Sequence, residues 1–124
     1  KRLFNAIGSV LAKDVGASAI LTGENLGQVS SQTLGNLGAV EEASDYRILR
    51  PLLGLDKQEI IDEARELGTY DIAAGPELCD ALGPDRPTTV ADLNRLRQNE
   101  MAQGGLTDLA DVCLESLRIR PLST

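Results

Sequence analysis

One segment constrains the fold of this chain more than any other feature. Residues 22–33 read Thr-Gly-Glu-Asn-Leu-Gly-Gln-Val-Ser-Ser-Gln-Thr; they follow the apolar run at 19–21 and lead into Leu34 and Leu37. This order predicts a strand end, a glycine-containing loop and a helix start. In open α/β folds such a loop presents backbone N–H groups at the carboxyl edge of the sheet, where anionic and nucleotide ligands bind.

Apolar spacing predicts the other elements. It favours helices over residues 2–15, 29–37, 57–67, 90–103 and 108–117, strands over 19–21 and 45–50, and a further short strand over 70–73. The β-α-β-α order implies a parallel sheet with right-handed crossovers. Two or three strands are too few for an isolated sheet covered on both faces, so we expect the missing strands upstream or in a partner.

Individual residues mark the ends of these helices. Asp56 and Glu59 have the spacing of a capping box, and Gly68 follows the helix that they begin. We expect Thr89 and Thr107 to cap the two C-terminal helices. A metal-ligand role for Asp56 is the minor alternative to capping.

Composition excludes several kinds of site. The chain has 124 residues, which suits one domain but is short for a complete nucleotide-binding α/β domain, so we expect a fragment. It has two cysteines and no histidine, which leaves no Cys/His metal set, no Ser-His-Asp triad and no Cys-His nucleophile pair. No apolar run approaches a membrane span and no signal peptide opens the sequence, so the expected location is the cytoplasm.

The acidic balance argues against a general nucleic-acid binder. The formal net charge is −7, whereas phosphate neutralisation requires a basic surface. A local basic patch remains an alternative to scattered solvated charges, and its candidate members are Lys1, Arg2, Arg47, Arg50, Arg118 and Arg120.

Four residues have chemistry that spacing alone leaves open. Gly23 either makes a turn or permits close approach of a ligand to the backbone, and Gln32 offers an amide donor and acceptor near a helix start. Arg50, at a predicted strand end, fits either an anion contact or a salt bridge. Cys113 lies among apolar residues at helical spacing and is predicted to be a small buried hydrophobe.

Cys79 stands in a Gly- and Pro-rich stretch over residues 70–87, which predicts a long loop. Its neighbours Glu77 and Asp80 raise the pKa of a thiol, so the residues alone predict a sluggish nucleophile unless Arg86, a helix terminus or a partner compensates.

Three strings in one order resemble a known family. They lie at residues 22–37, at 48–57 (Ile-Leu-Arg-Pro-Leu-Leu-Gly-Leu-Asp-Lys) and at 76–80 (Pro-Glu-Leu-Cys-Asp). Together they are similar to the tRNA 4-thiouridine synthetases (tRNA sulfurtransferases), in their adenylating domain. The resemblance implies a partial Rossmann-like, adenine nucleotide α-hydrolase-like fold. Residues 1–124 would be the carboxyl half of that domain, with an α/β part over 1–75 and a cysteine loop and C-terminal helices over 76–124.

The resemblance also implies an activity. Members of this family use ATP and Mg²⁺ to adenylate O4 of a tRNA uridine, and sulfur from a persulfide, supplied by a cysteine desulfurase, then replaces the activated oxygen. Some members also supply sulfur for the thiazole of thiamine. The ATP-contacting positions of the family match Lys1, Gly23 and Gln32. The cysteine of its Pro-Glu-x-Cys motif, which works in sulfur transfer, matches Cys79.

The chain departs from the family pattern in three ways. The Ser-Gly-Gly-x-Asp-Ser pyrophosphate loop is absent, so the chain alone is expected to be inactive. The tRNA-docking module and any rhodanese-like domain are also absent, so tRNA is expected to bind mainly through a separate domain. Leu82 stands where some archaeal members have a second cysteine, which argues against an iron–sulfur cluster. A non-catalytic nucleotide-binding or assembly module that completes a partner's sheet remains the alternative. If the edge of the sheet is otherwise bare, we expect a homo-oligomer.

Overall fold

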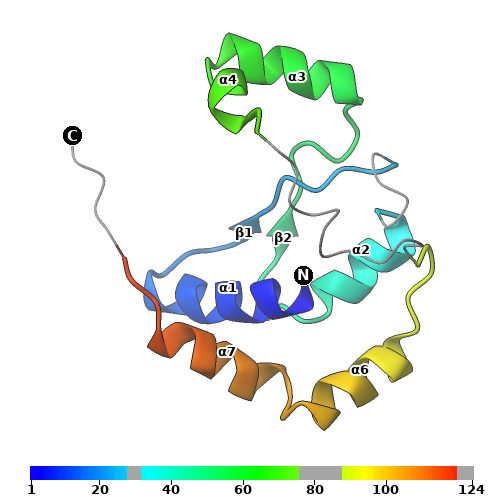
Figure 1. Ribbon diagram of the computed structural model, residues 1–124, viewed down its shortest axis with the longest axis vertical. Helices are drawn as coiled ribbons and strands as arrows, with labels where there is room; N and C mark the ends of the chain where they lie inside the picture. Colours follow the sequence, from blue (N-terminus) through cyan, green and yellow to red (C-terminus); the bar gives the residue numbers. More distant parts are fainter. Residues whose placement is uncertain (28–31, 76–87, 120–124) are drawn as a thin grey trace.

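The computed structural model describes residues 1–27, 32–75 and 88–119 and shows an α/β arrangement (Figure 1). The two strands pair in parallel, with Ile20 opposite Ile48 and Leu21 opposite Leu49. The α/β fold with a parallel sheet, flanking helices and a helical C-terminal region is therefore confirmed. In chain order the elements are α1 (Arg2–Asp14), β1 (Ile20–Leu21), α2 (Leu34–Glu41), β2 (Ile48–Leu49), α3 (Lys57–Glu66), α4 (Tyr70–Ala73), α6 (Leu93–Ala102) and α7 (Leu106–Glu115).

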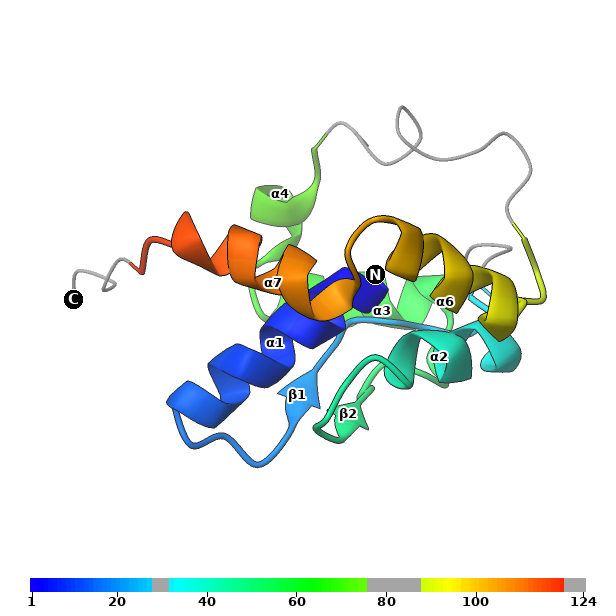
Figure 2. The ribbon, with the colours of Figure 1, turned by 90° about the horizontal axis from the view of Figure 1, so that it is seen from below.

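Helix α1 is the centre of the packing. It contacts β1, α2 and α7, and in Figures 1 and 2 α7 lies on the side of α1 away from the strands. The approach to β1 is close, because a Cβ added at Gly8 would lie 3.2 Å from Cδ1 of Ile20. Two buried polar residues of α1 bind the end of α2 and the segment that follows it: the Asn5 amide donates to the carbonyl of Val40 (2.9 Å), and the Ser9 hydroxyl accepts from the N–H of Asp45 (3.0 Å).

The apolar core of the described residues is small. Its buried members are Ala12, Leu37, Ala39, Ile48 and Ala110.

The second face of the sheet carries apolar side chains that stand in solvent: Leu21 is 68% exposed and its partner Leu49 is 49% exposed. The strand pair thus has cover from α1 on one face only within the described parts of the chain, as expected for an incomplete sheet.

Several predicted boundaries are wrong. Helix α2 begins at Leu34, because Thr33 caps it by accepting the N–H of Asn36 (3.2 Å), and it continues past Gly38 to Glu41. Residues 70–73 form a single helical turn and not a strand: Gly68 has a φ of +70°, and the N–H groups of Ala73 and Ala74 then bond the carbonyls of Thr69 and Tyr70. Residues 70–73 form a helical turn and not a strand because neither β1 nor β2 presents an edge beside them, whereas hydrogen bonds within the turn are available.

The caps of the two C-terminal helices also differ from prediction. Asp92, rather than Thr89, caps α6, since its carboxylate accepts the N–H groups of Asn94 (3.0 Å) and Arg95 (3.1 Å). Helix α7 begins at Leu106 after Gly105, whose φ is +90°, so Thr107 lies inside the first turn. Several residues near the start of each helix can act as its cap, and apolar spacing does not indicate which of them does.

The predicted start of α3 is confirmed. The Asp56 side chain accepts the N–H of Glu59 (2.9 Å), and the Glu59 side chain accepts the N–H of Asp56 (2.7 Å), which completes a capping box. The helix ends before Gly68, as predicted. No helix in the described ranges is long and apolar enough to cross a membrane.

Asp56→Ala is expected to lower the free energy of unfolding by about 1 kcal/mol, because it leaves the N–H of Glu59 in the first turn without its acceptor. Urea denaturation followed by circular dichroism measures the change. Glu63→Ala, a loss of an exposed carboxylate from the same helix, is the control and should shift stability by less than about 0.5 kcal/mol. Equal effects of the two substitutions would contradict the capping role.

Candidate functional site

The loop after β1 is fastened to the segment after β2. Asn25 is only 3% exposed, and its amide nitrogen donates to the carbonyls of Leu52 (2.7 Å) and Leu55. The N–H of Leu26 adds a bond to the carbonyl of Leu53 (3.2 Å). These bonds hold the loop at the carboxyl edge of the parallel strands, which is where open α/β folds bind ligands.

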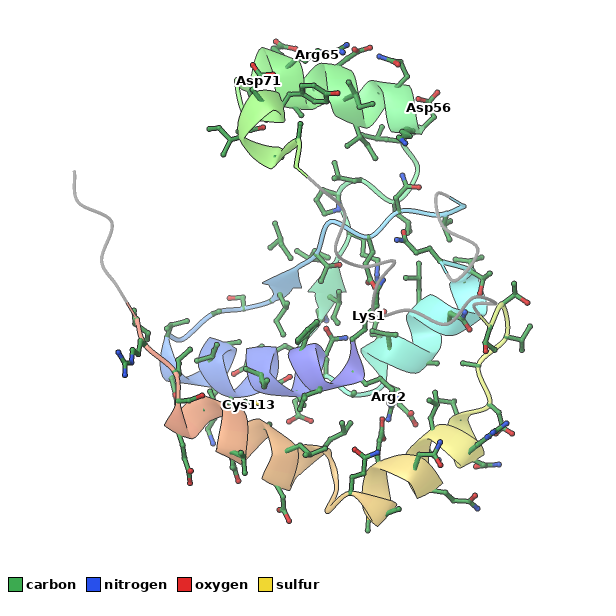
Figure 3. The ribbon with its side chains drawn as sticks, viewed as in Figure 1. Lys1, Arg2, Asp56, Arg65, Asp71 and Cys113 are labelled. Carbon is green, nitrogen blue, oxygen red and sulfur yellow. The ribbon has the colours of Figure 1, made fainter. Side chains whose placement is uncertain are left out.

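The structure brings three sequence-predicted residues to this loop. The Lys1 ammonium lies 3.2 Å from a carboxylate oxygen of Glu24, directly after Gly23 (Figure 3 labels Lys1). The side-chain carbonyl of Gln32 accepts the N–H of Asn25 (2.9 Å). Lys1 and Gln32 therefore contact Glu24 and Asn25, the two residues that follow Gly23. The amide nitrogen of Gln32 makes no hydrogen bond among the described residues and remains a donor for a ligand.

Gly23 does not make the turn. Its φ lies outside the left-handed region, whereas Gly27 has a φ of +77° and supplies the conformation that favours glycine. A Cβ built at Gly23 would meet no atom within 4 Å. The backbone conformation that favours glycine therefore occurs at Gly27 and not at Gly23, and the ligand role of Gly23 stays a prediction.

A charge cluster that sequence reasoning missed lies under this loop. Arg50, at the end of β2, donates to Glu24 (2.9 Å) and to Glu41 at the end of α2 (2.7 Å). The side chains of Arg50 and Glu24 are only 9% and 11% exposed. Arg50 thus makes the salt bridges that were one of its two predicted roles. The available signal was positional: Glu24 and Arg50 each follow a parallel strand, so both reach the same sheet edge.

Burial and ion pairing oppose each other in this cluster. Burial raises the pKa of Glu24, but hydrogen bonds from Arg50 and Lys1 outweigh it and hold that pKa below its ordinary value. Burial likewise lowers the pKa of Arg50, while hydrogen bonds to Glu41 and Glu24 raise it above its usual value. Glu24 is therefore a fixed negative charge at neutral pH, and it holds the Lys1 ammonium beside the loop.

A cavity of about 570 Å³ opens beside Lys1, between α2 and α6. Its volume lies within the range of about 300–1,000 Å³ that is typical of ligand sites. Figure 2 shows α6 lying alongside α2 next to the N-terminus of α1. The lining residues are Lys1, Glu24, Asn36, Leu37, Ala39, Val40, Thr88, Val90, Ala91, Asp92, Arg95, Leu96 and Asn99.

Cys79 lies outside the described residues, but the chain that follows its segment is anchored beside the loop. The Thr33 hydroxyl donates to the carbonyl of Thr89 (2.7 Å), and the Asn36 amide donates to the carbonyl of Thr88 (2.6 Å). Both donors stand at the start of α2, next to Gln32. Thr88 and Thr89 therefore lie beside the candidate site.

The prediction for Cys113 is wrong, because this cysteine is exposed on α7 (Figure 3). Within the described residues helix α7 packs mainly against α1, and Ala110 is its buried residue. In the parts of the chain that the structure describes, no group of three or more acidic, cysteine or histidine side chains could hold a metal ion.

Comparison with known proteins gives three findings. Residues 1–103 match the family described as thiamine biosynthesis protein (ThiI). The tRNA sulfurtransferase of Shewanella denitrificans is 39% identical over 93% of this chain and 26% of its own length. That of Shewanella amazonensis is 46% identical over 81% and 21%. The chain thus spans about a quarter of these relatives.

A solved structure matches as well. It is a 4-thiouridine synthetase–RNA complex with bound ATP, which superposes with a TM-score of 0.83 at 38% identity. The match covers 93% of this chain and 30% of the other.

Proposed function

Because this chain belongs to the ThiI family, whose matched relatives include proteins named tRNA sulfurtransferase, we propose that it is the carboxyl half of the adenylating domain of such an enzyme. The enzyme would activate O4 of a tRNA uridine with ATP and replace it with sulfur. The observation that carries this proposal is that Lys1 and Gln32 contact the two residues that follow Gly23, at the edge of the sheet.

The loop fits a nucleotide. Gly23 leaves open space against the backbone, Gln32 offers an unused amide donor, and the Lys1 ammonium has two N–H groups beyond the one facing Glu24. When bound, ATP supplies the adenylyl group that converts the uridine oxygen into a good leaving group. Magnesium commonly binds nucleotide phosphates with one or two protein carboxylates, so we expect it to accompany ATP.

Cys79 would act after activation. Sulfur arrives on a persulfide that a cysteine desulfurase generates, and its terminal sulfur attacks C4 of the uridine while the C4–O bond breaks and AMP leaves. The Cys79 thiolate then attacks the carrier sulfur of the resulting disulfide. A Cys79–carrier disulfide forms, and the bond to the transferred sulfur breaks, leaving that sulfur with its electron pair on the uridine. The anchoring of Thr88 and Thr89 beside Gln32 supports this placement.

The rest of the enzyme would supply what this segment leaves open. Leu21 and Leu49 are exposed apolar side chains, so we expect further elements of the adenylating domain to cover them. In this family that domain also carries the pyrophosphate loop. tRNA would dock mainly through a separate domain, since the segment has a net charge of −7. A role in thiamine biosynthesis, which the family description names, would use the same sulfur transfer. A homo-oligomer would be a second way to cover the sheet.

Gly23→Ala in the full-length enzyme carrying this segment is expected to weaken ATP binding at least about tenfold, because the added methyl group occupies the space open to the ligand. Calorimetric titration with ATP and magnesium measures the effect. Gly54→Ala is the matched control, since it also has an ordinary φ and open space at Cβ.

Gln32→Glu sharpens the same test. It keeps the oxygen that accepts the N–H of Asn25 but removes the amide donor, so the loop should persist while the affinity for ATP falls. Unchanged affinity in both site variants would rule out this loop as the nucleotide site.

A further inference from the structure

We propose that the cavity between α2 and α6 receives one nucleotide of the RNA substrate, the uridine to be thiolated, while ATP lies on the adjoining loop. The inference rests on the proposed function and adds a second binding site to it. Glu24 of the loop and Lys1, which pairs with it, both line the cavity, whereas Gly23 and Gln32 do not.

The lining suits a nucleobase. Leu37, Val40 and Leu96 provide apolar surface for the faces of a ring, and Asn99 brings an amide group that can pair with a base edge. Enzymes that modify a base hold it in such a pocket, after turning it out of the helix. A uracil ring presents both donors and acceptors, which amides match.

The charges favour a single nucleotide over a triphosphate. Lys1 and Arg95 are balanced by Glu24 and Asp92, so the wall has no net formal charge. The carboxylate of Glu24 is already held by Arg50 and Lys1, and that of Asp92 by the start of α6. Arg95 makes no ion pair within the described residues. Its guanidinium is therefore available for one backbone phosphate of RNA.

The wall formed by α6 is fixed in place. Arg2 reaches Glu100 with two hydrogen bonds (2.6 and 3.1 Å) and also donates to Glu42, which in turn accepts from Arg97. This network connects α6 to α1 and α2. The hydrogen bonds to the carbonyls of Thr88 and Thr89 connect the segment before α6 to α2. The cavity is thus bounded by elements that are cross-linked to one another.

The position of the cavity next to the loop also favours a uridine site. Adenylation requires the uridine and the nucleotide to be held in contact, and a cavity that shares two residues with the nucleotide loop provides that proximity. The matched 4-thiouridine synthetase was solved with RNA and ATP together, so a related protein accommodates both ligands at once.

Photocrosslinking tests the site directly. The product base, 4-thiouridine, forms zero-length crosslinks under near-ultraviolet light, so tRNA carrying it at the target position is irradiated with the full-length enzyme. Peptide mapping should place the crosslink within residues 34–40 or 88–99, with competition by unmodified tRNA. Crosslinks confined to other peptides would overturn the proposal. Labelling of these peptides by 8-azido-ATP would also overturn it, because the adenosine of ATP would then occupy the cavity.

Arg95→Ala provides a kinetic readout. The KM for tRNA should rise about tenfold while the KM for ATP is unchanged, and Arg95→Lys should recover part of the loss. Arg118→Ala removes the same charge from an exposed position after α7, outside the cavity and its supporting network, and should change the KM for tRNA less than twofold. Equal effects of Arg95→Ala and Arg118→Ala would refute the site. If Gln32→Glu still weakens ATP binding in that case, the proposed function stands without this cavity.

Discussion

Cys79→Ser in the full-length enzyme carrying this segment is expected to lower the rate of tRNA thiolation at least about a hundredfold and to leave adenylation unchanged. A serine hydroxyl cannot exchange with a persulfide or disulfide, whereas ATP would contact a different part of the site, around Gly23 and Gln32. Thiolation is measured from the near-ultraviolet absorbance of 4-thiouridine, and adenylation from tRNA-dependent release of pyrophosphate in a single turnover.

Cys113→Ser is the matched control, because this second cysteine is exposed on α7. It should leave both rates within a factor of two. Normal thiolation by the Cys79 variant would exclude Cys79 from sulfur transfer. Loss of pyrophosphate release together with thiolation would instead give Cys79 a role in adenylation and contradict the proposed division of labour.

Arg50→Met is expected to lower the free energy of unfolding by about 3 kcal/mol. The substitution keeps apolar bulk but leaves the carboxylate of Glu24 without its principal partner in a site that is 11% exposed, and loss of one member of a buried pair typically costs about 3–5 kcal/mol. The value falls at the low end because Glu41, the other partner, is half exposed. Urea denaturation measures the change.

Arg65→Met is the comparison, since the Arg65–Asp62 pair is exposed at both side chains. Its loss should cost less than about 1 kcal/mol. If the two variants were equally stable, the Arg50 cluster would contribute no more than a surface ion pair.

Acid provides a second readout of the same cluster. The pKa of Glu24 is lowered in the folded protein, so its contribution to stability is complete above the ordinary glutamate pKa of about 4.3 and is lost as the pH falls through the lowered folded value. In Arg50→Met burial dominates and the pKa of Glu24 rises. Acidification should then protonate the buried Glu24 carboxylate of the variant and relieve its unpaired charge, so the difference in stability between the variant and the unchanged protein should narrow as the pH falls.

Local rules in the sequence were enough for features that depend on neighbouring residues. The capping box of Asp56 and Glu59 and the stop at Gly68 follow from bonds within one turn of helix, and both were predicted correctly. The parallel strand pair followed from the order of elements.

Features that depend on distant partners were missed. Residues 70–73 were predicted as a strand although β1 and β2 present no adjacent edge to them, and Cys113 was predicted to be buried although α7 has too few neighbours to cover it. For the site, the family resemblance indicated Lys1, Gly23 and Gln32, whereas the Glu24–Arg50 cluster and the cavity require two strand ends and two helices to meet.

The hydrogen bond from Thr33 to the carbonyl of Thr89 limits how far Cys79 can lie from the start of α2. Cys79 precedes Thr89 by ten residues, and an extended chain of that length spans at most about 35 Å. Cys79 therefore lies within about 35 Å of Thr89, whatever path the intervening residues take, and a sulfur carrier that exchanged with it as proposed would have to approach within that reach of the same edge of the sheet.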